Sequence, residues 1–308
     1  MVKKHNTLLV LTGPTAVGKT RISIALAKRF NTAIISADSR QCYQGMPIGT
    51  AQPSLAELTE VKHYFINEFL VSEPQDAASF ERLALGYLEE IFSTNSVAIV
   101  CGGTGLYIKA LCEGLDEMPA VSEAMKATVE AGYKENGLDW LQEALAKEDP
   151  QFVGSAEWQN PARLMRALSF VRSNGNSIRS FQSGLKKERP FELIKFALNL
   201  PRELLYARIN ERVDLMMQSG LLEEAKAMFP YRQYPPLNTV GYVELFDFFD
   251  GKCSLNDAVE KIKQHSRNYA KRQLTWLLRD QSLHWIDTNT DAKAEICSLL
   301  EKNFPAFL

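Results

Sequence analysis

The stretch GPTAVGKT, residues 13–20, has the pattern G-x-x-x-x-G-K-[ST] of a phosphate-binding loop. It follows an apolar run at residues 7–11 and opens a segment with helical periodicity, so we expect a strand, this loop and a helix in succession. Backbone N–H groups and the Lys19 ammonium suit phosphate oxygens, and the Thr20 hydroxyl suits Mg²⁺. The candidates for binding a diphosphate or triphosphate are Gly13, Pro14, Thr15, Ala16, Val17, Gly18, Lys19 and Thr20.

Apolar runs rich in β-branched residues predict a parallel sheet. They lie at residues 8–11, 33–36, 97–101, 191–200 and, more weakly, 284–287. Helical patterns separate the first three runs, which implies βαβ units and an α/β fold. Ligands of such sheets collect at the carboxyl ends of the strands. The phosphate-binding loop, the segment ADSRQ and the segment GGTG follow the first, second and third runs, so we expect these loops to form one site.

The middle of the chain differs in character from both ends. Helical patterns at residues 122–132, 138–147 and 161–171 fill the region between the third and fourth runs. We therefore expect a P-loop NTPase-like α/β core made of residues 1–116 and 190–308, with a helical insertion domain at residues 117–189. The core should end in helices, at residues 201–219, 222–228 and 255–278.

Composition narrows the possible functions and compartments. The 308 residues carry a formal net charge of −2, so any surface for nucleic acid must be locally basic. The cysteines lack C-x-x-C spacing and the histidines are isolated, which argues against a zinc site and against a hydrolytic triad. The apolar run near the N-terminus is too short to span a membrane or to act as a signal peptide. We expect a cytoplasmic protein that does not bind membranes.

Asp38 comes directly after the second expected strand. An aspartate in an Asp-Ser pair often caps a helix or closes a turn. A carboxylate beside a phosphate site can instead hold a metal or take a proton from a nucleophile. The position of Asp38 at the strand end favours the catalytic interpretation.

The segment Gly102–Gly105 ends the third expected strand, where a nucleotide hydrolase would usually carry an acidic metal ligand. This segment offers backbone N–H groups and the Thr104 hydroxyl instead, which weakens an ATPase interpretation. Thr104 could also be an ordinary turn residue.

Local basic positions occur on several expected helices. Residues 263, 267 and 271 form a cationic row on the helix at residues 255–278. Such a row is usually a solvated face, but the neighbouring aromatic and amide side chains would also suit RNA. Arg163 and Arg166 form another basic pair, and Arg208 and Arg212, four residues apart, could reach phosphates or pair with nearby acids.

Taken together, the motifs of this chain resemble those of the bacterial tRNA dimethylallyltransferases, also called tRNA isopentenyltransferases or IPP transferases. They are GPTAVGKT, ADSRQCYQGMPIGTAQP, CGGTGLYIKAL, NPARLMRAL, RINERVDLMMQSGLLEEA, NTVGYVEL and RNYAKRQLTWLLRD. Two positions depart from the family pattern. Gln52 stands where the family's GTAKP has lysine, and Tyr64 follows His63 where the family has paired histidines.

The resemblance implies transfer of a dimethylallyl group from dimethylallyl diphosphate to N6 of adenosine 37, the nucleotide 3′ of the anticodon, in tRNAs that read codons starting with U. The products are N6-(dimethylallyl)adenosine and diphosphate. By this resemblance Asp38 removes the N6 proton, Arg212 assists departure of the diphosphate together with Lys19 and Mg²⁺ on Thr20, and Thr104 positions the adenine or the diphosphate.

The resemblance also makes the tRNA anticodon stem-loop the partner. The target base must leave the stack of the loop to enter the site, and the helical insertion would grip the anticodon stem. The implied tRNA contacts are Asp38, Ser39, Arg40, Gln41, Thr104, Lys126, Arg163, Arg166, Asn238, Gly241, Tyr242, Lys271, Arg272, Gln273 and Trp276. We expect the enzyme to act as a monomer.

Three other interpretations are compatible with a phosphate-binding loop. A small-molecule kinase would not need the basic aromatic helix at residues 255–278. An RNA-dependent ATPase or an RNA-binding module would leave Asp38 and Thr104 without a role. An isopentenyltransferase that acts on free adenine nucleotides would not need Arg163, Arg166 or that C-terminal helix.

Overall fold

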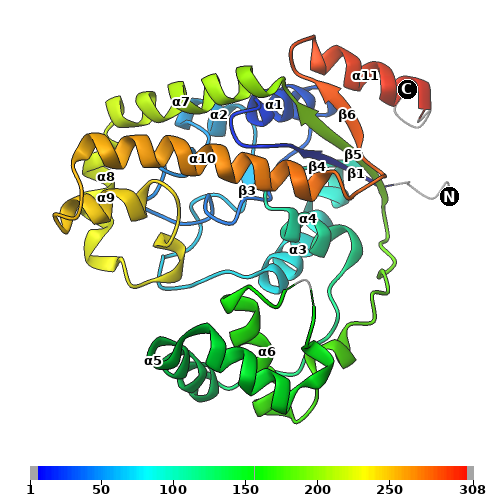
Figure 1. The fold of residues 1–308 in the computed structure, drawn as a ribbon. Coiled ribbons are helices and arrows are strands. Elements are labelled where there is room, and N and C mark those ends of the chain that lie inside the picture. Colours follow the sequence, from blue (N-terminus) through cyan, green and yellow to red (C-terminus); the bar gives the residue numbers. More distant parts are fainter. Residues whose placement is uncertain (1–5, 156, 304–308) are drawn as a thin grey trace. The chain divides into compact units, whose positions relative to one another are not determined.

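The computed structural model describes residues 6–155 and 157–303 (Figure 1). At its centre lies a six-stranded sheet in the order β3-β2-β4-β1-β5-β6, with every neighbouring pair parallel. The strands are β1 (Thr7–Thr12), β2 (Ile34–Ser36), β3 (His63–Tyr64), β4 (Val97–Gly102), β5 (Glu192–Asn199) and β6 (His284–Asp287). The expected α/β fold is confirmed. The short β3 was not predicted, because two residues carry no recognisable period.

Helices connect the strands and follow them. In the first part of the chain these are α1 (Lys19–Phe30), α2 (Leu55–Glu60), α3 (Ala77–Thr94) and α4 (Gly105–Glu113). The middle contains α5 (Glu123–Glu148) and α6 (Pro161–Asn174), and α5 is broken at Gly137, whose φ is 77°. The last part contains α7 (Arg202–Gln218), α8 (Leu221–Met228), α9 (Tyr242–Phe249), α10 (Leu255–Leu277) and α11 (Ala292–Asn303).

The sheet is buried on both faces, as a parallel sheet must be. All six residues of β1 are buried, because β1 lies between β4 and β5. Leu9 and Leu11 belong to a core cluster that also contains side chains of α1, α7 and α11. Val10 and Leu8, which point to the other face, are also buried, and α3 contacts the neighbouring strand β4.

The chain forms two compact units. One contains residues 1–113 and 188–308, and the other contains residues 114–187. The second unit is helical and has its own hydrophobic core, which includes Val129, Leu141, Leu164 and Phe170. In the first unit α10 runs alongside α7 and also packs against α9 (Figure 1). Within the two described stretches of chain, none of the helices combines the length and the apolar character that crossing a membrane requires.

Candidate functional site

The phosphate loop, residues 13–20, joins β1 to α1 as expected. Gly13 has a φ of 151°, and a Cβ added there would lie only 2.8 Å from the carbonyl oxygen of Leu198 on β5, so the position requires glycine. Gly18 is the N-cap of α1 and supplies no side-chain hydrogen bond. The N–H groups of the first helical turn therefore remain available to an anion, which the helix dipole also favours.

Lys19 directs its ammonium back into the phosphate loop. Its Nζ donates to the carbonyl oxygens of Gly13 at 2.9 Å and Pro14 at 2.8 Å. Burial lowers the pKa of Lys19 from 10.5 to about 8, Cys101 and Asp38 oppose this, and Arg212 lowers the pKa further. A partly buried cation held by neutral carbonyls is well placed for an anion, because hydrogen bonds to charged acceptors are stronger.

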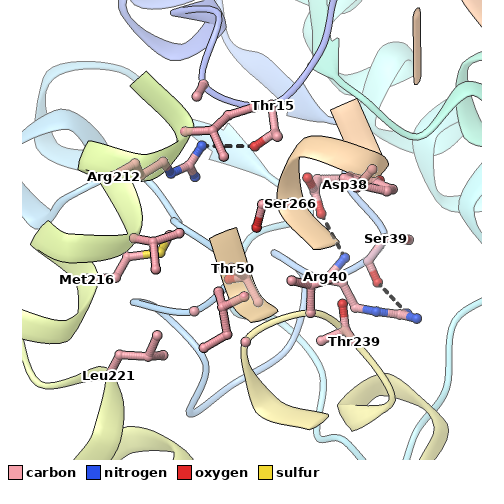
Figure 2. Close-up of a pocket in the computed structure, with 18 residues that line it drawn as sticks. Thr15, Asp38, Ser39, Arg40, Thr50, Arg212, Met216, Leu221, Thr239 and Ser266 are labelled. Atoms are coloured by element: carbon pink, nitrogen blue, oxygen red, sulfur yellow. Dashed lines mark hydrogen bonds between the residues drawn. The ribbon is translucent and has the colours of Figure 1, made fainter. Parts of the chain in front are cut away.

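Arg212 supplies a second, partly buried cation from α7. Its Nη1 donates to Oγ1 of Thr15 in the phosphate loop at 3.1 Å (Figure 2). Burial lowers the pKa of Arg212, and the negative charge of Asp38 opposes that change. Lys19 and Arg212 line the same cavity, so the structure brings together the two cations expected to face a diphosphate.

Asp38 lies in the Asp38 loop, residues 37–41, which follows β2. Its Oδ1 accepts hydrogen bonds from the backbone N–H groups of Arg40 at 2.9 Å and Gln41 at 3.3 Å. Asp38 therefore closes a turn, which is one of the two interpretations its sequence allowed. It also lines the same cavity as Arg212 and Thr15, so closing the turn does not remove the carboxylate from the cavity (Figure 2).

Thr104 ties the Gly-Thr loop, residues 102–105, to the Asp38 loop. Its Oγ1 accepts from the backbone N–H of Ser39 at 3.0 Å, and its own N–H donates to the carbonyl oxygen of Ala37 at 3.1 Å. The loops after β2 and β4 are thus held together. The convergence expected from the parallel topology is present in the structure.

The three loops border two adjoining cavities that share Thr15, Asp38, Arg212 and Tyr269. The larger, about 550 Å³, is lined by Lys19 and Thr20 among other residues. The smaller, about 190 Å³, has an apolar end. That end is lined by Ile209, Val213, Met216, Leu221 and Ile262. Figure 2 shows Met216 and Leu221 on one side of this cavity and Asp38 on the other.

Tyr269 was not among the site residues that the sequence indicated. It lines both cavities from α10, and burial together with nearby Asp38 raises its pKa to about 12. A spacing of four, three and four residues places Ile262, Ser266, Tyr269 and Gln273 on one helical face, and all four line the cavities. This spacing is the sequence signal from which a face of α10 toward the site could have been predicted.

The donor atoms present fit a magnesium ion. Thr20 and Asp38 both line the larger cavity, and they offer a hydroxyl and a carboxylate oxygen. Mg²⁺ commonly takes few protein ligands and completes its shell with phosphate oxygens and water. In the described part of the chain no three or more histidine, cysteine or acidic side chains gather as a metal cluster, so Mg²⁺ would depend on the phosphate ligand.

Comparison with known proteins identifies the family. A family model described as IPP transferase matches residues 41–280. A protein of Christiangramia forsetii named tRNA dimethylallyltransferase is 44% identical over 288 residues, which cover 94% of this chain and 95% of the relative. The chain belongs to the IPP transferase family.

Solved structures of proteins with the same activity in their names also match this chain. The full-length tRNA isopentenylpyrophosphate transferase of Bacillus halodurans matches with a TM-score of 0.71 and 35% identity, covering 98% of this chain and 97% of that one. A eukaryotic dimethylallyltransferase acting on tRNA matches with a TM-score of 0.80 and 25% identity, covering 98% of this chain and 80% of that one. The expected P-loop NTPase-like fold is confirmed.

The residues that the family resemblance assigned to tRNA are divided between the two compact units. Lys126, Arg163 and Arg166 are exposed on the unit of residues 114–187, where Lys126 pairs with Glu123 and Arg163 with Glu157. Asp38, Ser39, Arg40, Gln41, Thr104, Asn238, Gly241, Tyr242, Lys271, Arg272, Gln273 and Trp276 belong to the other unit.

Two of the three residues in the expected cationic row on α10 are held by side chains of α7. Lys263 pairs with Asp214 at 2.8 Å, and Arg267 donates to Asn210 at 2.6 Å, so both are engaged by α7. Lys271 and Arg272 are exposed. Their charges are therefore accessible to a ligand.

Tyr242 is fully buried, so its side chain presents no surface to an RNA in this structure. Its hydroxyl donates to Oε1 of Glu224 at 2.6 Å, and the same carboxylate accepts the backbone N–H groups of Ile48 at 2.8 Å and Gly49 at 2.7 Å. Tyr242 and Glu224 therefore hold the segment that leads to Thr50 at the cavity wall. Glu224 was not predicted as a site residue, because an acidic residue on an amphipathic helix forms no sequence pattern that marks it as functional.

The two departures from the family pattern, Gln52 and Tyr64, both make specific contacts in the structure. The Nε2 of Gln52 donates to the carbonyl oxygens of Gln41 and Tyr43, each at 2.9 Å. Gln52 thus supports the Asp38 loop through its donor group. Tyr64 is buried and stacks on Tyr87 with ring centroids 4.7 Å apart.

Anion binding should make Lys19 take up a proton at alkaline pH. Its pKa of about 8 in the free protein should rise when diphosphate binds, because the anion favours the ammonium form. Below that pH Lys19 is already charged. Above it, binding must restore the proton, and the affinity for inorganic diphosphate should fall by up to about tenfold per pH unit.

Titration calorimetry in buffers of different ionisation enthalpy, at about pH 7 and about pH 9, measures this uptake. A Lys19→Met variant serves as the control for protons taken up by the ligand itself. Equal uptake by both proteins at the higher pH would contradict the assignment.

Proposed function

We propose that the protein transfers a dimethylallyl group from dimethylallyl diphosphate to N6 of adenosine 37 of tRNA, forming N6-(dimethylallyl)adenosine and releasing diphosphate. Family membership and the names of the relatives support the reaction class. The observation that carries the proposal is the composition of the joined cavities. A cationic phosphate site, an apolar end and the Asp38 carboxylate share one space.

The phosphate loop supports departure of the diphosphate. The leaving group gains negative charge as the carbon–oxygen bond breaks, and the partly buried cations Lys19 and Arg212 line the cavity in which we place the diphosphate. Fixed cations and backbone N–H groups stabilise such charge without reorganising. Mg²⁺ held by Thr20 and the diphosphate would supply further charge neutralisation when bound.

The apolar end of the smaller cavity suits a short branched hydrocarbon. Met216 and Leu221 border it together with the buried side chains of Ile209, Val213 and Ile262. A dimethylallyl chain placed there would lie beside Arg212 and within the same cavity as Asp38. This arrangement also withholds water from the allylic carbon, which develops positive charge as the diphosphate leaves.

Asp38 is the proposed base. Both of its turn hydrogen bonds go to Oδ1, so we assign Oδ2 to proton transfer. As the N6 lone pair forms the new bond to the allylic carbon, the N6 proton passes to Asp38 and the diphosphate leaves with the electron pair of the broken bond. Such proton removal contributes roughly 10²–10⁴ in rate.

We propose that the tRNA is held by exposed cations while the target base enters the cavity. Lys271 and Arg272 on α10 are exposed beside the site, and the unit of residues 114–187 carries exposed Lys126, Arg163 and Arg166 for the anticodon stem. Drawing the base from its stack costs a few kcal/mol. The protein would act on tRNAs that read codons starting with U, as a monomer in the cytoplasm.

The identity of the acceptor distinguishes this proposal from its rivals. Purified protein is incubated with labelled dimethylallyl diphosphate and either unmodified tRNA or adenosine monophosphate. We expect label in the tRNA alone. Label in adenosine monophosphate alone would indicate an enzyme for free nucleotides, and no label in either would reject prenyl transfer.

The base role predicts the effect of Asp38→Asn. The asparagine oxygen keeps the turn to Arg40 and Gln41, whereas Asp38→Ala would also loosen the loop. We expect the single-turnover rate of transfer to fall by about 10²–10⁴, with the tRNA dissociation constant unchanged within about twofold. Transfer within a few-fold of the normal rate would exclude Asp38 as the base.

The exposed charge of Lys271 predicts a salt effect. Lys271→Ala should weaken tRNA binding and reduce the slope of log affinity against log salt concentration by about one. Filter binding over a range of salt concentrations measures the slope. An unchanged slope would show that Lys271 does not contact a phosphate.

A further inference from the structure

Gln273 links two loops of the site through one side chain. It is 8% exposed on α10, and its Oε1 accepts from the backbone N–H of Thr15 at 2.8 Å. Its Nε2 donates to the carbonyl oxygen of Gly103 at 3.0 Å. Because an N–H can only donate and a carbonyl can only accept, these partners fix the orientation of the amide.

The loops leave no space between themselves and this face of α10. A Cβ added at Gly103 would clash with Nε2 of Gln273, and one added at Gly105 would clash with the indole of Trp276. The glycines of the Gly-Thr loop therefore allow the helix to approach the backbone. This close approach is what lets the short carboxamide reach both loops.

The bridge continues into the residues proposed for chemistry. Thr15 also accepts from Arg212, so this one residue of the phosphate loop is held from α10 through its backbone and from α7 through its side chain. Gly103 precedes Thr104, whose Oγ1 accepts from Ser39 in the Asp38 loop. A continuous set of hydrogen bonds thus runs from Arg212 to the residue next to Asp38.

We propose that Gln273 is a positioning residue that sets the phosphate loop at a fixed distance from the Gly-Thr and Asp38 loops, rather than a contact for the tRNA. The inference rests on the proposed function for its chemistry, since diphosphate and acceptor must be aligned for transfer. A carboxamide is suited to this place because it has one acceptor for Thr15 and one donor for Gly103.

Variants of Gln273 separate positioning from RNA binding. Gln273→Leu removes both hydrogen bonds and leaves two partly buried backbone groups without this side-chain partner. We expect the affinity for inorganic diphosphate and the kcat/KM for dimethylallyl diphosphate to fall by about tenfold to a hundredfold. The dissociation constant for tRNA should stay within about twofold. Lys271→Ala, two residues away on the same helix, is the matched control. It should weaken tRNA binding and leave the affinity for inorganic diphosphate unchanged.

Gln273→Glu supplies a readout that a general loss of packing would not give. The ionised carboxylate is repelled by the carbonyl oxygen of Gly103, whereas the protonated acid again has one acceptor and one O–H donor. Diphosphate affinity relative to the unmodified protein should therefore recover as the pH falls toward about 5, and Gln273→Leu should show no recovery. The variant is its own folding control, because the ionised and the protonated forms of the new side chain are measured on the same protein.

Three results would overturn the proposal. They are a loss of tRNA affinity in Gln273→Leu as large as that in Lys271→Ala, unchanged diphosphate affinity in both Gln273 variants, or no recovery of Gln273→Glu at low pH. Failure of the proposed function would look different. The unmodified protein would then transfer no prenyl group, while inorganic diphosphate binding would still report on Gln273.

Discussion

Two partly buried positive charges lie at one end of the sheet, and much of the surrounding structure serves to hold them. Lys19 and Arg212 both have their pKa lowered by burial, so their charged forms carry a cost in the free protein. Loop carbonyl oxygens and the Thr15 hydroxyl offset part of that cost. An anionic ligand would offset it better, and this difference is the physical basis on which we propose that the cavity binds a diphosphate.

The parallel topology explains why Asp38 belongs to the same space. Strands β1, β2 and β4 all run in one direction, so their following loops meet at one edge of the sheet. Beyond the backbone hydrogen bond from Thr104 to Ala37, side chains hold these loops together. Thr104 holds the Asp38 loop, Gln273 holds the phosphate loop and the Gly-Thr loop, and Gln52 supports the Asp38 loop from the other side. A carboxylate is thereby kept near two cations without being neutralised by direct pairing.

Local patterns made the phosphate loop, the long strands and the helical nature of residues 114–187 predictable from sequence. Each depends on neighbours along the chain: glycines at a turn, a run of β-branched residues, or a period of 3.6. The convergence of loops also followed, because topology alone dictates it. Asp38 was expected either to close a turn or to lie at the phosphate site. In the structure one of its oxygens closes a turn, and the residue also lines the cavity.

Other features depend on partners distant in sequence and were missed. Strand β3 and helices α9 and α11 were not predicted. On α10 the sequence suggested an apolar stripe with Ile262 and Ser266 and a separate basic row joined by Tyr269 and Gln273, whereas in the structure these four residues line the cavities together. This orientation is set by α7, where Asp214 and Asn210 engage Lys263 and Arg267 and so turn Tyr269 and Gln273 toward the loops. Similarly, Tyr242 was expected to contact RNA, and only the packing of Gly49 and Glu224 around it shows that it is buried.

The central claim is that the phosphate loop retains a leaving diphosphate while the carbon chain moves to a nitrogen acceptor. The most direct test is one reaction with tRNA and dimethylallyl diphosphate that carries different isotopes in its carbon chain and its phosphorus atoms. The account predicts that the carbon label enters tRNA in equal amount to the phosphorus label released as inorganic diphosphate. Phosphorus label in the acceptor would contradict it, because the loop would then serve phosphoryl transfer.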